Sequence, residues 1–144
     1  MKTFITIIVA AFMLTNNYAS ATAPETTKRS NVAAINFTLD LYANAVSKGQ
    51  VDGIEQLFSE QFHQRYSSKN RSYIFNKAQL VGFLKSHRNL QQNCETDYSI
   101  IEESKGVAIA KVEMKYKTFC RVDYVTISLS GNGYQISQIV STFK

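Results

Sequence analysis

Residues 32–49 read VAAINFTLDLYANAVSKG, and this stretch decides the fold. Its apolar side chains recur at helical spacing along one stripe, with a second stripe beside it: Ile35, Leu39, Tyr42 and Val46, then Ala34, Phe37, Leu41 and Ala45. Gly49 follows at the place where a left-handed C-cap is expected. The pattern predicts a helix with an unusually wide buried face, as if the helix were laid inside a curved sheet.

Two shorter helices are predicted after the first one. Asp52 and Glu55 stand three apart and give a capping-box-like start to a short helix. Asn76 and Gln79 repeat this spacing ahead of an apolar period that continues to His87, which predicts a third helix. Between these helices we expect short strands at residues 62–66 and 72–75.

After Cys94 the apolar period changes from 3.6 to 2, the period of strands. Core-type side chains alternate with polar ones from residue 108 to residue 117, and again from residue 124 to residue 130. Asn132-Gly133 predicts a hairpin that pairs Leu129 with Ile136 and Val125 with Val140. Ile136 and Ile139 lie three apart, which predicts a bulge. The outward residues are mostly polar, so we expect a monomer or a weak homodimer: Lys111, Glu113, Lys115, Lys117, Thr126 and Ser128.

Helices followed by a meander of long strands predict an α+β fold. In this fold a cone-shaped, strongly curved, mostly antiparallel sheet wraps around the long N-terminal helix. The folded domain is expected at residues 32–144, after a disordered leader at residues 22–31 that is polar and contains the single proline.

Residues 1–21 are typical of a secretory signal peptide. Lys2 precedes an uncharged apolar run, Phe4–Leu14, and the small residues Ala19-Ser20-Ala21 offer a cleavage site. The run is 11 residues long, whereas a helix needs about 20 to span a bilayer. We therefore expect an exported protein, periplasmic or secreted, without stable membrane insertion.

The chain contains four short motifs that are typical of one fold: Leu39-x-x-Tyr42, Val51-Asp52-Gly53-Ile54 ahead of Leu57-Phe58, Phe75-Asn76-Lys77, and Gly133-Tyr134-x-Ile136. With these motifs, residues 32 to 144 resemble the nuclear transport factor 2-like superfamily, in particular its small exported members of the lumazine-binding or SnoaL-like type. The resemblance implies a cystatin-like cone with a pocket between the long helix and the concave sheet. The superfamily includes isomerases, dehydratases and binding modules. Its enzymes use an aspartate or histidine inside the cone with a tyrosine partner, and no motif of this chain matches theirs residue by residue.

Motifs with defined chemistry are absent from the sequence. It contains no G-x-S-x-G, Walker, H-E-x-x-H or C-x-x-C pattern, so we expect no metal and no cofactor. Without the signal peptide the chain has 15 basic and 11 acidic side chains, a net charge of about +4. No dense basic stripe accompanies this mild charge, which argues against nucleic acid as a partner.

Two side chains are candidates for a catalytic base. Asp123 shares the parity of Val125 and would face the concave side, although a strand-start residue turned to water has the same pattern. His87 continues the apolar face of the third helix, as a packed or surface-edge histidine also would. The residues expected to line the pocket equally fit a filled core: Tyr42, Phe83, His87, Tyr98, Met114, Tyr116 and Asp123.

Two further features bear on ligand and stability. No acid occurs between Glu60 and Glu95, and the basic residues there would form either a rim that attracts an anion or a solvated face: Arg65, Lys69, Arg71, Lys77, Lys85 and Arg88. Cys94 and Cys120 are a candidate disulfide. The expected register places them roughly 13 Å apart, beyond the ~7 Å that a bridge allows.

Three functions stay open at this point. We expect an exported domain that binds a small, partly apolar molecule in its conical pocket without transforming it. If the basic residues form a rim, this molecule would be anionic. The first alternative is an enzyme of the isomerase, dehydratase or hydrolase kind, with Asp123 or His87 as base and Tyr98 or Tyr116 as hydrogen-bond donor. The second alternative is a protein-interaction module whose cone is filled.

Overall fold

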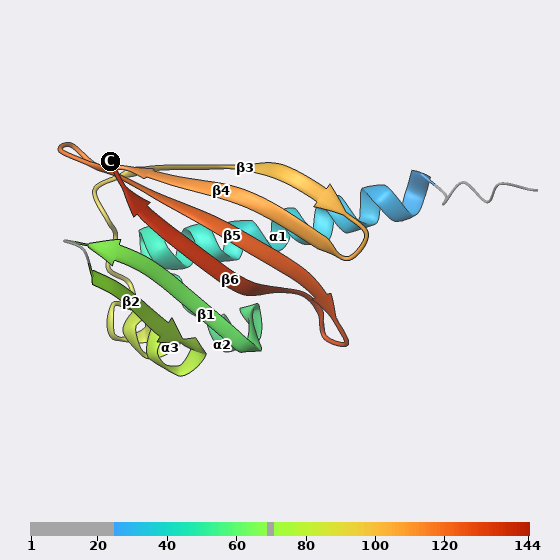
Figure 1. Cartoon of the computed structure of the whole chain (residues 1–144), viewed down its shortest axis with the longest axis horizontal. Helices are drawn as coiled ribbons and strands as arrows, with labels where there is room; N and C mark the ends of the chain where they lie inside the picture. The colour runs from blue at the N-terminus through green and yellow to red at the C-terminus, as the bar shows by residue number, and fades with distance from the viewer. Residues whose placement is uncertain (1–24, 69–70) are drawn as a thin grey trace, which may run out of the picture.

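Helix α1 lies along the concave side of a single curved sheet (Figure 1). The computed structural model describes residues 25–68 and 71–144, so the predicted signal peptide at residues 1–21 lies outside it. The elements, in chain order, are α1 (Glu25–Lys48), α2 (Ile54–Leu57), β1 (Phe58–Ser68), β2 (Arg71–Asn76), α3 (Lys77–Ser86), β3 (Glu95–Ser104), β4 (Val107–Lys115), β5 (Cys120–Ser130) and β6 (Gly133–Phe143).

The six strands follow the order β2-β1-β6-β5-β4-β3. Every neighbouring pair is antiparallel except β1 and β6, which run parallel. The predicted α+β class, with a curved and mostly antiparallel sheet around a long helix, is confirmed. The parallel pair joins the hairpin β1–β2 to the long meander β3–β6, and α3 lies beside this hairpin at one end of the cone (Figure 1).

Helix α1 is anchored by one stripe of the predicted pattern. Ile35, Leu39 and Tyr42 are wholly buried against the sheet. The second stripe is only partly used: Phe37 is 64% exposed and Leu41 is also exposed, so the predicted wide buried face is wrong. The sheet covers one side of the helix, and these two side chains lie beyond its reach.

The helix also begins earlier than the sequence predicts. It starts at Glu25, so residues 25–31 are helical, whereas the whole segment 22–31 was expected to be a disordered leader. Once the turns around Ile35 are held by packing, adding a turn costs little, because propagation is far easier than nucleation.

The helix ends confirm one cap prediction and correct another. The side chain of Asn76 accepts from the backbone N–H of Gln79, whose side chain accepts from the backbone of Asn76, so α3 has the predicted capping box. The capping box predicted for α2 is wrong. Gly53 is its N-cap, with φ 70° and no side-chain cap, and Asp52 instead pairs with Arg88.

Strands β4, β5 and β6 carry the core as the alternation predicts. The inward residues of β4 are all buried: Ala108, Ala110, Val112 and Met114. The predicted β5–β6 register is wrong, because the turn is Gly131-Asn132: Leu129 pairs with Tyr134, and beyond the bulge Val125 pairs with Ile139 instead of Val140. The predicted bulge is confirmed: the register shifts between Thr126 and Ile127, and Ile136 and Ile139 are both wholly buried.

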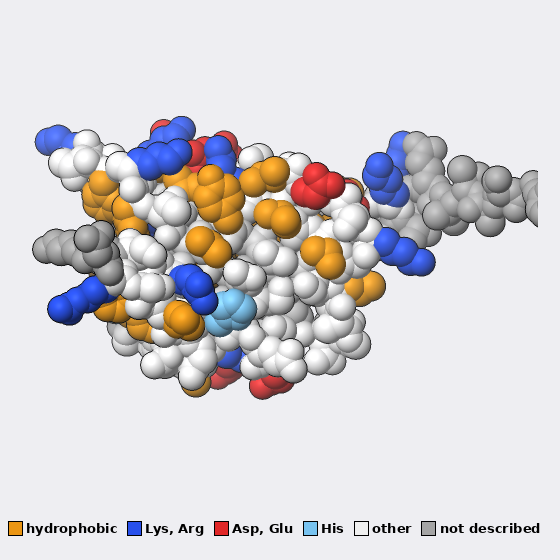
Figure 2. Space-filling model, viewed as in Figure 1, with side chains coloured by type: hydrophobic (Ala, Val, Ile, Leu, Met, Phe, Trp, Pro, Cys, Tyr) orange, Lys and Arg blue, Asp and Glu red, His pale blue; other side chains and the backbone are white. Residues whose placement is uncertain are grey.

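The outer face of the sheet is mixed rather than purely polar. Figure 2 shows hydrophobic side chains separated by polar and charged ones over this face. Ile74, Ile109 and Tyr124 are exposed, while Lys111 and Glu113 form an ion pair of 3.2 Å on β4. Among the described helices, none is both long enough and apolar enough to cross a bilayer.

Candidate functional site

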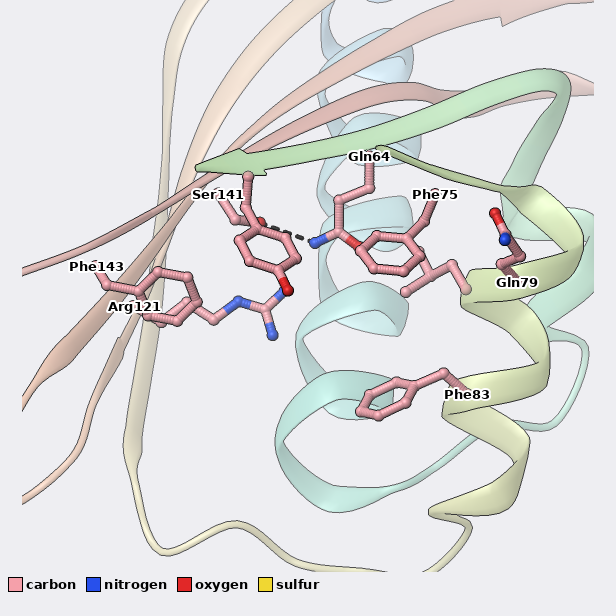
Figure 3. Close-up of a pocket in the computed structure, with 9 residues that line it drawn as sticks. Gln64, Phe75, Gln79, Phe83, Arg121, Ser141 and Phe143 are labelled. Atoms are coloured by element: carbon pink, nitrogen blue, oxygen red, sulfur yellow. Dashed lines mark hydrogen bonds between the residues drawn. The ribbon is translucent and has the colours of Figure 1, made fainter. Parts of the chain in front are cut away.

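A cavity of about 460 Å³ opens between α3 and the concave side of the sheet, at the end of the cone where β1, β2, β5 and β6 meet (Figure 3). This volume lies in the range of small-molecule sites, about 300–1,000 Å³. The lining residues come from five elements: Gln64, Tyr66, Phe75, Gln79, Leu80, Phe83, Arg121, Ser141 and Phe143. We call this space the mouth cavity.

The charged end of the mouth cavity is a buried ion pair. Arg121 and Asp123 stand two apart on β5 and therefore share a face. The Nε of Arg121 donates to Oδ1 of Asp123 at 3.0 Å, and its Nη2 contacts Oδ2 at 2.9 Å. Tyr42 of α1 donates its hydroxyl to the same Oδ2 at 2.7 Å. We call these three residues the Arg121 triad.

Asp123 is closed to the solvent and to the cavity. Its side chain is 0% exposed, whereas that of Arg121 is 21% exposed and reaches the cavity wall. Both carboxylate oxygens already accept from Arg121, and Oδ2 accepts from Tyr42 as well. A general base needs a lone pair within reach of the substrate proton. Asp123 therefore positions Arg121 and offers no free base to the cavity.

The triad also shifts the protonation of its members. Burial and the neighbouring Asp123 raise the pKa of Tyr42 well above its ordinary value. Burial opposes the charge of Arg121, but the electrostatic influence of Tyr42 and Asp123 raises the pKa of Arg121 above its ordinary value. At neutral pH Tyr42 is thus a hydrogen-bond donor and Arg121 a fixed cation.

Aromatic rings form one wall of the mouth cavity. Tyr66 of β1 stacks on its cross-strand neighbour Tyr73 (centroids 4.8 Å apart) and on Phe75 (5.8 Å), and its ring meets Phe143 edge-on at 6.2 Å. Gln64 and Ser141 add the polar part of the wall, and the amide nitrogen of Gln64 donates to the Ser141 hydroxyl at 2.8 Å (Figure 3). The arrangement combines flat apolar area with few polar groups, which is typical of small-molecule sites.

The residues predicted to line the pocket divide into three groups. Phe83 lines the mouth cavity from α3. Tyr42, Met114 and Asp123 are wholly buried and belong to the packed interior, so expecting them as lining residues is corrected here. The interior around these residues is filled with side chains rather than open.

The remaining predicted residues lie away from the mouth cavity or at its edge. His87 is the C-cap of α3; its Nδ1 is 2.8 Å from the carbonyl oxygen of Phe83 and its ring lies 4.3 Å from that phenyl ring. This half-buried position at the end of the helix fits the surface-edge interpretation of His87. Tyr98 lines a separate, polar depression of about 290 Å³ between α1 and β3.

Tyr98 and Tyr116 both make local contacts. The hydroxyl of Tyr98 donates to Asp40 of α1 at 2.8 Å, and burial together with this bond raises the pKa of Tyr98 to about 12. Tyr116 stacks on Phe119 with ring centroids 4.4 Å apart. Burial and the neighbouring Cys94 raise the pKa of Tyr116. Neither tyrosine pairs with Asp123 or His87 as the enzyme hypothesis requires.

Cys94 and Cys120 are free thiols in the structure. Lys115 pairs with Glu95 on one side and with Cys120 on the other, so Cys94, directly before β3, and Cys120, at the start of β5, lie on opposite sides of β4. Two strand spacings amount to about 10 Å, again more than the ~7 Å of a disulfide. The chain turns back at residues 116–119, but the turn places Cys120 on β5, so β4 lies between the two cysteines.

Three of the six residues of the predicted basic rim are paired with acids. Lys77 pairs with Glu60, Lys85 with Glu55, and Arg88 with Asp52. The bond from Lys85 lowers the pKa of Glu55. Acids from earlier in the chain thus cover this face of α3, which leaves Arg121 as the cation that reaches the mouth cavity.

Several lining residues were not among the predicted ones, chiefly Gln64, Phe75 and Phe143. The sequence signal that could have identified Gln64 is the period-two pattern of residues 62–66, which places Phe62, Gln64 and Tyr66 on one face of the strand. As for metals, residues 25–68 and 71–144 contain no group of three or more His, Cys, Asp or Glu side chains that could hold an ion.

Comparisons with known proteins identify the fold. No protein-family model matches the chain, and no curated protein matches it by sequence. Solved structures do match. An NTF2-like protein of unknown function from Silicibacter pomeroyi aligns over 81% of this chain and 98% of its own, with 13% identity and a TM-score of 0.66.

Two other solved structures agree with this match. An NTF2-like protein of unknown function from Shewanella baltica covers 81% of this chain and 95% of its own at 14% identity, with a TM-score of 0.65. Another from Methylobacillus flagellatus covers 80% of this chain and 93% of its own at 16% identity, with a TM-score of 0.61. The chain therefore has the nuclear transport factor 2-like fold, as the sequence resemblance implied.

Proposed function

We propose that this protein binds a small, partly apolar molecule in the mouth cavity and does not transform it. The observation that carries the proposal is the cavity itself: a mainly apolar space between α3 and the sheet, with aromatic rings and one guanidinium in its wall. Sites of this composition gain affinity from apolar burial and orientation from a few polar groups.

The engagement of Asp123 supports binding over catalysis. Its carboxylate is wholly buried and held by Arg121 and Tyr42, and His87 caps α3 at the surface. No pair of base and donor is therefore presented to a molecule in the mouth cavity by the residues that line it. We place this binding outside the cytoplasm, because the apolar run Phe4–Leu14 is typical of an export signal.

The test pairs two exposed phenylalanines. Phe83 is 56% exposed and lines the mouth cavity, whereas Phe37 is 64% exposed on α1 and does not line it. Native mass spectrometry of the purified protein, followed by titration with the molecules found or with an aromatic fragment set, identifies binders. Phe83→Ala should weaken binding about tenfold, since a ring contact contributes about 1.5 kcal/mol, and Phe37→Ala should have no effect.

Two results would contradict this proposal. Equal losses of affinity in Phe83→Ala and Phe37→Ala would place the binding site elsewhere. Recovery of a chemically altered ligand after incubation with the protein, checked by liquid chromatography and mass spectrometry, would favour the enzyme alternative instead.

A further inference from the structure

The charge that a ligand meets in the mouth cavity comes from one side chain. Among the described residues that line this cavity, Arg121 is the one with a formal charge. Its counter-ion Asp123 is 0% exposed, so it lies behind the guanidinium and outside the ligand's reach. A bound molecule therefore faces the positive side of the ion pair.

Arg121 lines the cavity, and its guanidinium keeps N–H donors that Asp123 does not use. An arginine side chain has five N–H donors, and the two contacts with Asp123 use one donor of Nε and one of Nη2. Three donors remain, on Nη1 and Nη2, and a hydrogen bond between the guanidinium and the Tyr42 hydroxyl takes one of them, which leaves an edge of two. Such an edge matches a planar group with two acceptor oxygens, and a carboxylate is the best fit because its hydrogen bonds to arginine are charge-assisted and parallel.

The rest of the triad holds this edge in place. Asp123 binds the guanidinium through both oxygens, and Tyr42 fixes Asp123 from α1. The side chain of Arg121 thus loses little freedom when a ligand binds. A preformed donor geometry of this kind strengthens binding because the cost of ordering is already met in the free protein.

The aromatic wall of the cavity fits a ligand whose remaining part is flat and apolar. Tyr73, Tyr66 and Phe75 are nearly parallel, with interplanar angles of 17° and 13°. Phe83 faces the same cavity from α3, and Phe143 contributes a ring beside Arg121 (Figure 3). Aromatic ligands pack on such rings in stacked or edge-on geometry, which adds to their area burial.

We propose that the ligand of the mouth cavity is a planar aromatic carboxylate, with its carboxylate on the free edge of Arg121 and its ring against Tyr66, Phe75 and Phe83. This inference rests on the proposed function and narrows it to a chemical class. Asp123 and Tyr42 are positioning residues for Arg121 in this assignment.

The experiment compares two probes of the same shape, naphthoate and its neutral carboxamide, by isothermal titration calorimetry at neutral pH. The wild-type protein should bind naphthoate at least tenfold more tightly, the order expected for charge-assisted hydrogen bonds. In the double variant Arg121→Gln with Asp123→Asn the preference should disappear, because both charges are removed together. Phe83→Ala should weaken both probes by the same factor, and Phe37→Ala should change neither.

A second variant covers the case in which the double variant does not fold. Arg121→Lys keeps the charge and loses the planar fork, so the preference for naphthoate should fall several-fold while Asp123 stays paired. A salt titration of the wild-type protein adds a readout that needs no variant, since binding of naphthoate should weaken with ionic strength and binding of the carboxamide should not.

The outcomes separate this inference from the proposed function. Equal affinity of the wild-type protein for both probes overturns the carboxylate assignment and leaves small-molecule binding in place. A preference that persists unchanged in Arg121→Lys or in the double variant overturns the role of Arg121. Failure of both probes to bind overturns the aromatic class, and the fate of the proposed function then depends on the molecules retained through purification.

Discussion

The ion pair between Arg121 and Asp123 offers a stringent test of the interior, because breaking it from one side leaves a buried charge. Removing one partner of a buried pair costs about 3–5 kcal/mol. The Asp123 side chain is 0% exposed, but Arg121 is 21% exposed, so water screens part of any unpaired charge. We therefore expect Asp123→Asn and Arg121→Gln each to lower the free energy of unfolding by about 2–4 kcal/mol.

The double variant should cost less than the sum of the two single ones. With Asn and Gln facing each other, both charges are absent and an amide hydrogen bond can replace the pair, so we expect a total loss of about 1–3 kcal/mol. The coupling free energy should then be at least about 1 kcal/mol. Tyr42→Phe serves as the matched control, since it removes only the hydroxyl donated to Oδ2 and should cost about 1.5–3 kcal/mol.

Urea unfolding at neutral pH, followed by far-ultraviolet circular dichroism, measures all four variants. A domain of this size has a total stability of about 5–15 kcal/mol, so the single variants should still give complete transitions. Strict additivity of the two single losses would refute the reasoning, because it would mean that the guanidinium and the carboxylate do not interact in the folded protein.

Three other predictions test the fold and its pH dependence. Leu39→Ala should cost about 2–5 kcal/mol in urea unfolding through lost transfer energy and a cavity, whereas Glu113→Ala on the outer face should stay within about 0.5 kcal/mol; equal losses would contradict the helix-in-cone packing. Gly49→Ala should lower the free energy of unfolding by at least about 2 kcal/mol, since φ is +64° and a Cβ would lie 2.6 Å from the carbonyl oxygen of His87. Gly53→Ala, at φ +70° with nothing within 4 Å, should lower it by only about 1 kcal/mol. A larger loss at Gly53 than at Gly49 would contradict the close contact at Gly49. The folded protein favours neutral Tyr98, so the stabilisation from its hydroxyl is fully present below pH ~10 and is lost as the pH rises toward about 12. Tyr98→Phe should therefore flatten the loss of stability measured by unfolding at pH 9, 10 and 11. An unchanged slope would exclude the bond to Asp40.

The parts of the fold that local periodicity determines could be predicted from the sequence. Ile35 and Leu39 mark the buried stripe of α1, and Asn76 with Gln79 marks the start of α3, because both patterns depend on residues within two turns of one another. The bulge could be predicted from Ile136 and Ile139, since both must face the core and an odd spacing requires an extra residue.

The mouth cavity could not be predicted, because it depends on pairing between distant segments. The parallel contact of β1 with β6 carries Gln64 and Tyr66 beside Ser141, and no local pattern of residues 58–68 indicates that partner. The same limit explains why Met114 and Tyr42 were expected to line the pocket. Their inward parity is correct, but parity does not show whether the space in front of a side chain is open or filled by another element.

The spacing of Arg121 and Asp123 decides what this end of the cone can do. Alternate residues of a strand point to the same face, so an arginine two positions before an inward aspartate lies next to it in any register. Inside a cone that excludes water, the two charges pair rather than stay apart, because an unpaired buried charge is costly. The carboxylate is thereby bound at both oxygens and the guanidinium is turned toward the mouth cavity. A free aspartate at this place would suit proton abstraction, whereas the paired one leaves a positioned cation, which suits the recognition of an acceptor group.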